Sequence, residues 1–115
     1  MTAPDGGWDR QALEQRYLEL VRRLLPAAAR QGGWVLRDDH CFGRVLLDDA
    51  VGACWYDVLD RRRTAFRQLD DEQLAGAVAL AERLLAEGDP LLRELDARSL
   101  AWRGKLQKPA RRPGR

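Results

Sequence analysis

Residues 69–104 read LDDEQLAGAVALAERLLAEGDPLLRELDARSLAWRG, and this stretch decides the fold class. Asp70, followed three positions later by Gln73, forms a capping-box signature with further acids in the first turn. Apolar residues then recur at three- and four-residue steps until Gly88, a natural helix stop. Asp89-Pro90 suits the N-cap and first position of the next helix, which the final glycine ends. The stretch therefore predicts two consecutive helices.

Two more helices are predicted towards the N-terminus. Helical periodicity begins at Asp9, and Pro26 is expected to end or kink this helix. A further helix over about residues 40–50 has Asp38 or Asp39 as its N-cap and Gly52 at its end. With no internal repeat and no convincing strand pair, the sequence predicts an all-α compact bundle of four to five helices.

The chain divides by composition into a flexible N-terminus at residues 1–8, one helical domain at 9–104 and a basic disordered tail at 105–115. No apolar run approaches the roughly 20 residues that span a bilayer, and the first residues lack a secretory pattern. We therefore expect a cytoplasmic protein whose two cysteines are free thiols. The abundance of Arg, Leu, Ala, Gly and Asp suggests a GC-rich bacterial genome.

Charge is distributed unevenly along the chain. The whole sequence carries +2, of which the last eleven residues contribute +5 with no acid, so residues 1–104 carry −3. A basic tail on an acidic body suggests binding of nucleic acid or another acidic partner through phosphate contacts. A purely solubilising tail is the alternative. The candidate anion-binding residues are Arg44, Arg98, Arg103, Lys105, Lys108, Arg111 and Arg112.

The only histidine, His40, and one of the two cysteines, Cys41, are the candidate catalytic residues. His40, Arg44 and Asp48 have i, i+4, i+8 spacing and so share one helix face. A helix N-terminus favours neutral imidazole and lowers a thiol pKa. The structural alternative is a surface histidine beside a weak Arg44–Asp48 ion pair, with Cys41 as a small buried hydrophobe.

Metal binding is not predicted. A structural zinc site needs four ligands, usually in spaced pairs. His40, Cys41 and Cys54 would need a carboxylate such as Asp38 or Asp57 to complete the set. No cofactor is predicted either. Gly43, inside the helix over residues 40–50, could permit close packing of a neighbouring backbone.

The four tryptophans divide into two pairs by sequence context. Trp55 and Trp102 lie among apolar residues, and we expect them in the core. Trp8 and Trp34 adjoin glycine pairs and are candidate interface residues, or stacking surfaces for nucleic acid, at the surface. Burial in a small core is the alternative for both of them, and it is the more common role of a tryptophan. A homodimer or another protein complex built on Trp8 and Trp34 is one alternative function.

Residues 40–48 (HCFGRVLLD), residues 52–55 and residues 98–105 (RSLAWRGK) resemble a small uncharacterised bacterial family, over about residues 14–105. Some of its members carry an N-acetyltransferase-related label. The acetyl-CoA loop of common N-acetyltransferases is Arg/Gln-x-x-Gly-x-Gly/Ala between a strand and a helix. The nearest strings here, at residues 30–35 and 73–78, both end in Val, and the second lies in a predicted helix. The resemblance therefore does not supply an acetyltransferase activity, but it implies that the helix over residues 40–48 and the segment 98–105 belong to one structural unit.

The sequence thus leads to three expectations of function. The first is a non-enzymatic accessory protein that binds a polyanion through its basic C-terminal segment. The second is a small enzyme or small-molecule sensor around His40, Cys41 and Arg44, in which Arg44, Arg103 and Lys105 join His40 along an anion-accepting groove. The third is the protein-interaction module.

Overall fold

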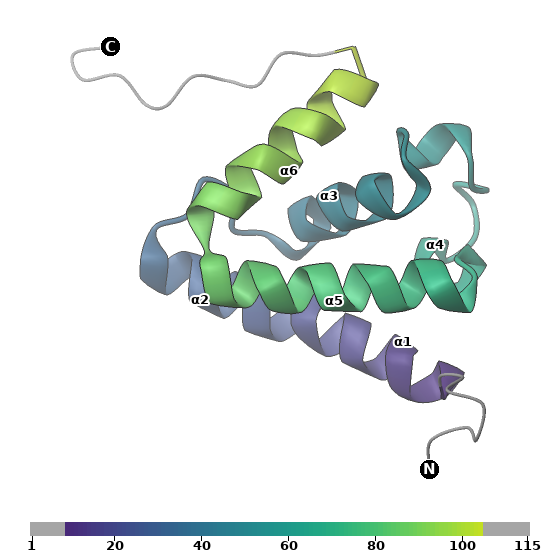
Figure 1. Cartoon of the computed structure of the whole chain (residues 1–115), viewed down its shortest axis with the longest axis horizontal. Helices are drawn as coiled ribbons and strands as arrows, with labels where there is room; N and C mark the ends of the chain where they lie inside the picture. The colour runs from purple at the N-terminus through teal and green to yellow at the C-terminus, as the bar shows by residue number, and fades with distance from the viewer. Residues whose placement is uncertain (1–8, 105–115) are drawn as a thin grey trace.

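The computed structural model describes residues 9–104, and every regular element in that range is helical, which confirms the predicted all-α class. A π-helical turn joins the first two helices, and a 3-10 turn follows the third (Figure 1). Among these residues no helix has the length and apolarity needed to cross a membrane. The elements are α1 (Arg10–Glu19), the π turn (Leu20–Leu24), α2 (Leu25–Gly32), α3 (Asp39–Val51), the 3-10 turn (Trp55–Asp57), α4 (Ala65–Gln68), α5 (Asp71–Glu87) and α6 (Asp89–Trp102).

Helical structure continues through Pro26, where an end or a kink was expected. The reason is the π turn that precedes the proline: the N–H of Leu25 donates to the carbonyl of Leu20, five residues back. Pro26, which has no N–H to place, follows directly as an early residue of α2. Gly33 then ends α2 in the left-handed conformation (φ 66°), as the glycine pair predicted.

The other helix boundaries follow the sequence signals closely. The carboxylate of Asp70 accepts the N–H of Gln73, and the Gln73 side chain returns a bond to Asp70, so the capping box of α5 is confirmed. Gly88 (φ 78°) makes the turn from α5 to α6. α3 has Asp38 as its N-cap residue and Gly52 (φ 72°) at its C-terminus, as predicted.

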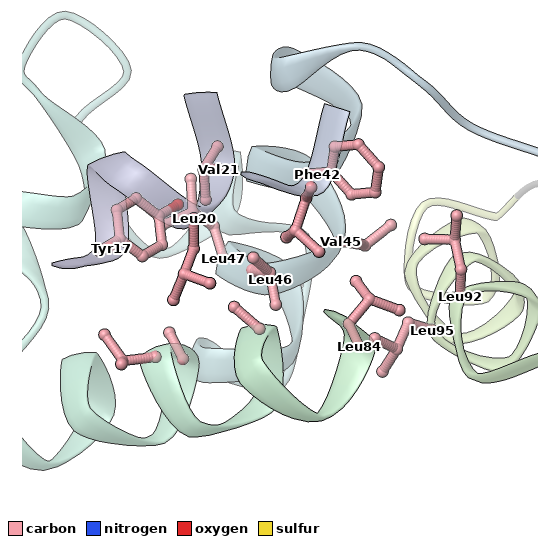
Figure 2. Close-up of a cluster of buried hydrophobic side chains, with 14 of the residues drawn as sticks. Tyr17, Leu20, Val21, Phe42, Val45, Leu46, Leu47, Leu84, Leu92 and Leu95 are labelled. Atoms are coloured by element: carbon pink, nitrogen blue, oxygen red, sulfur yellow. The ribbon is translucent and has the colours of Figure 1, made fainter. Parts of the chain in front are cut away.

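Helix α5 is the centre of the bundle. In Figure 1 it runs across the molecule, with α1 and α2 along one side and α3 and α6 on the other. It packs against both α1 and α3, and α3 packs in turn against α6. Figure 2 shows the apolar side chains that these elements bury together: Tyr17, Leu20, Val21, Phe42, Val45, Leu46, Leu47, Leu84, Leu92 and Leu95.

Two tryptophans do not occupy the surface and core positions considered for them from the sequence. Trp34, a candidate interface residue with the core as its alternative, is 8% exposed and packs edge-on against Phe42 with ring centroids 6.2 Å apart. The ring occupies space left by Gly32, since a Cβ there would lie 2.6 Å from Trp34 Nε1, whereas one on Gly88 would lie 3.6 Å away, in ordinary van der Waals contact. Trp102, expected in the core, is 38% exposed because it lies on the last turn of α6.

Candidate functional site

A buried polar cluster joins α3 to α6, and Asp48 is its centre. The Asp48 side chain is fully buried, and it accepts bonds from Ser99 Oγ (2.6 Å) and from Arg103 Nε (2.9 Å) and Nη2 (3.1 Å). It also accepts the backbone N–H of Trp55 at 2.9 Å, which holds the turn after α3. A buried carboxylate is stable only with such partners. The Asp48 carboxylate raises the pKa of the Arg103 guanidinium, against the effect of burial.

Arg44 forms the second half of this polar cluster. Its Nη2 donates to Asp96 Oδ1 at 2.6 Å, and its Nη1 donates to Ser99 Oγ at 2.8 Å. Ser99 therefore bridges the two ion pairs. Within residues 9–104 every buried side-chain nitrogen and oxygen has a hydrogen-bond partner. Two arginines balance two aspartates, so the polar cluster (Arg44, Asp48, Asp96, Ser99 and Arg103) carries no net charge.

This arrangement corrects two expectations. Arg44 pairs with Asp96 across the helix interface, and Asp48 pairs with Arg103, so the predicted Arg44–Asp48 pair does not form. Arg44 and Arg103 are also both engaged by buried carboxylates, which leaves little of their charge for an external anion. Arg98 lies on the exposed side of α6, 3.4 Å from Asp49. The described residues therefore do not form the expected anion-accepting groove.

Sequence reasoning missed Asp48, Asp96 and Ser99 as a unit. The signal was present in the spacing: Asp96, Ser99 and Arg103 follow Leu92 at helical steps, so they continue its buried face. Polar residues at core-facing positions predict a buried network. Their partners on α3, about fifty residues earlier, are not indicated by any local pattern.

His40 and Cys41 lie at the N-terminal end of α3, and Cys41 is near Arg44 and Asp96 of the polar cluster. The His40 side chain is 79% exposed, and its Nδ1 is 3.9 Å from Asp39 Oδ1, beyond hydrogen-bond range. Cys41 is half-buried, and burial raises the pKa of its thiol more than the nearby Arg44 lowers it. The expectation of a lowered thiol pKa was therefore wrong, because desolvation outweighs the helix terminus and the guanidinium.

Asp38, His40 and Cys41 nevertheless lie close together. One ligand atom from each falls within 4.8 Å of the others. The group lies at the N-terminus of α3, where the partial positive charge of the helix disfavours a cation. Cys54, the fourth residue considered from sequence, lies beyond the far end of α3 and is buried. These residues do not form the four-ligand set of a structural zinc site.

The far end of α6 carries a different kind of surface. A hollow of about 340 Å³ there is lined by Cys54, Tyr56, Asp57, Trp102 and Arg103. Tyr56 is 42% exposed, and the guanidinium carbon of Arg61 lies 4.2 Å from its ring centroid. The Arg103 guanidinium lies 4.8 Å from the same ring. Exposed aromatic rings and arginines thus meet where α6 ends.

A larger hollow of about 490 Å³ lies between α3 and α5. Leu46 and Ala77 contribute to its floor, and the carboxylates of Asp49, Asp70 and Glu72 contribute to its lining. These negative charges raise the electrostatic free energy of a phosphate brought near them. This hollow is therefore unsuited to a polyanion.

The remaining predicted residues lie outside the described range, so their placement is not addressed. They are Trp8, Lys105, Lys108, Arg111 and Arg112. No protein-family model, curated protein or solved structure matches this chain.

Proposed function

We propose that the protein is a cytoplasmic, non-enzymatic binding protein that engages nucleic acid through its basic C-terminal segment and the adjoining end of the helical body. The observation that carries this proposal is the position of exposed Arg61, whose guanidinium lies on the Tyr56 ring, the same ring that Arg103 contacts at the end of α6. In the sequence, the five-charge segment follows that helix. Arg103 is neutralised by Asp48 and only holds this end of the bundle in place, so the charges offered to phosphate are those of Arg61 and of the basic segment.

The cytoplasmic part of the proposal is supported by Cys41 and Cys54, both of which are free. An enzyme or sensor around His40, Cys41 and Arg44 has less support. Arg44 is held by Asp96, and burial disfavours the Cys41 thiolate. A protein interface on Trp34 is disfavoured because that side chain is buried.

The test measures affinity for a short duplex and for a single strand of equal length, from about 50 to 200 mM salt. If all five tail charges contact phosphates, the slope of log K against log salt is about −4.5 for the duplex and about −3.5 for the single strand. A chain ending at Gly104 should lose nearly all of this binding. Undiminished binding by the shortened chain would refute the proposal.

A single-charge comparison sharpens the test. Arg111→Gln should reduce the magnitude of the duplex slope by about 0.9, the value of one phosphate contact. Arg83→Gln is the matched control, because Arg83 lies on the exposed side of α5 in a pair with Glu87. It removes the same charge from the protein. Equal effects of the two substitutions would mean that net charge alone governs binding.

A further inference from the structure

We propose that the hollow beside Trp102 receives an unpaired nucleobase, so that the protein binds single-stranded nucleic acid more tightly than a duplex. The inference rests on the proposed function and names its ligand class more narrowly. It comes from the hollow of about 340 Å³ at the end of α6, which is near the lower end of volumes typical of small-ligand sites, about 300–1,000 Å³.

Trp102 provides the stacking surface. Its indole is 38% exposed on the last turn of α6, while apolar residues earlier in the helix, such as Leu92 and Leu95, are buried. A large, flat and partly exposed ring at the wall of a hollow is the arrangement on which bases stack without regard to sequence. The next residue, Arg103, is fixed by Asp48, so the platform is held by the bundle core.

The charges around the hollow favour different positions for the base and the phosphate of a nucleotide. Asp57 is the carboxylate in the lining, and it disfavours a phosphate inside while offering an acceptor to the N–H groups of a base. Arg61 lies outside, stacked on Tyr56 and exposed. A nucleotide can therefore place its base against Trp102 and its phosphate towards Arg61.

This arrangement discriminates against a duplex. Bases in a duplex are paired and stacked on one another, and moving one out costs a few kcal/mol. A single strand offers its bases at much lower cost. A single strand and a duplex both offer phosphates to the basic segment. Only the binding of a base in the hollow therefore favours the single strand over the duplex.

The experiment compares a single strand that carries bases with an abasic strand of the same length, which keeps the phosphates and lacks the bases. The full-length chain should bind the base-bearing strand at least about fivefold more tightly, the lower end of one stacked base. Trp102→Ala should abolish that preference and leave affinity for the abasic strand unchanged. Trp102→Phe should keep most of it, because a flat ring remains.

The matched control is Val35→Ala, since Val35 is exposed to a similar extent (42%) and lies near the opposite end of α6, where its N–H bonds to Asp89. Thermal unfolding of each variant verifies that it folds. Equal binding of base-bearing and abasic strands by the full-length chain overturns this inference alone. A preference that survives Trp102→Ala also overturns it. Absence of salt-dependent binding to either strand refutes the proposed function itself.

Discussion

Arg103 donates to both carboxylate oxygens of Asp48, from Nε to Oδ2 at 2.9 Å and from Nη2 to Oδ1 at 3.1 Å. The arginine side chain is 13% exposed, and the aspartate is fully buried. This bidentate geometry is the strongest form of an arginine–carboxylate contact. It fixes the last turn of α6 against α3. It thereby also fixes the residues that line the hollow beside Trp102.

Asp48→Asn should destabilise the protein by about 3–5 kcal/mol, because it leaves the Arg103 guanidinium partly buried beside a neutral amide. Urea unfolding followed by tryptophan fluorescence measures the change. The control is Asp49→Asn, whose partner Arg98 is 3.4 Å away and exposed, so the expected loss is below about 1 kcal/mol. Equal losses for the two variants would contradict the central role of Asp48.

Local signals in the sequence predicted the helices well. The Asp70–Gln73 capping box, and the glycines that end α2, α3 and α5, depend on a few neighbouring residues and could be recognised without the fold. Tertiary packing determines which aromatic side chains are buried, and these local signals do not show that. Trp34 is buried against Phe42, where the missing side chain of Gly32 leaves room for its ring and Gly88, from a separate part of the chain, lies in van der Waals range.

The candidate site shows the same limit. The spacing of Asp96, Ser99 and Arg103 places them on one face of α6, but it does not reveal that this face meets α3. The i, i+4 spacing suggested that Arg44 pairs with Asp48. Each of the two instead forms a more buried ion pair with a residue at α6: Arg44 with Asp96, and Asp48 with Arg103. Helix periodicity gives the face of each helix, and packing selects its partner.

Replacement of glycine by alanine should have opposite effects on stability at Gly43 and at Gly32. Gly43 lies inside α3, and a Cβ there would have no atom within 4 Å, so the close backbone packing considered from sequence is absent. Gly43→Ala should stabilise the protein by about 0.5–1 kcal/mol through helix propensity. Gly32→Ala should destabilise it by about 1–3 kcal/mol, because the new Cβ would lie 2.6 Å from the Trp34 ring.

Thermal unfolding of both variants measures this difference. Trp34 fluorescence gives a second readout for Gly32→Ala, since displacement of a buried indole exposes it to water. If both substitutions stabilise the protein equally, the ring of Trp34 does not occupy the space beside Gly32.

Acid should weaken the link between α6 and the connection from α2 to α3, in which Val35 lies. Partial burial opposes ionisation of Asp89, but the N–H of Val35 and the guanidinium of Arg93 together hold the pKa of this carboxyl below its ordinary value. A lowered folded-state pKa gives stability that is present above the unfolded pKa of about 3.9 and is lost as the pH falls through the folded value.

Asp89→Asn should therefore reduce the loss of stability between about pH 5 and pH 2, because the titrating group is gone while an oxygen acceptor remains. Urea unfolding at a series of pH values measures it. Glu94→Gln, a charge-matched change on an exposed position of α6, serves as the comparison. An identical acid profile for the Asn variant and the unmodified protein would refute a role for Asp89.

Cys41 should react slowly as a nucleophile. Because burial raises the pKa of its thiol, less thiolate is present at neutral pH than for a free cysteine. With Cys54→Ala as background, Cys41 is the only thiol in the chain, and the rate of disulfide exchange against pH gives its pKa directly. A midpoint below that of free cysteine would revive the enzyme or sensor interpretation.

The π turn before Pro26 has a consequence for changes in chain length. It contains one residue more than the same turn of an α-helix would, so loss of one residue between Leu20 and Leu24 would restore regular α-helix and keep α1 and α2 in register. The proline ring would then meet the carbonyl four residues before it. Deletion of one residue from Leu20–Leu24 and replacement of Pro26 are therefore coupled. Each change should reduce the stability of the fold less when the other is also present.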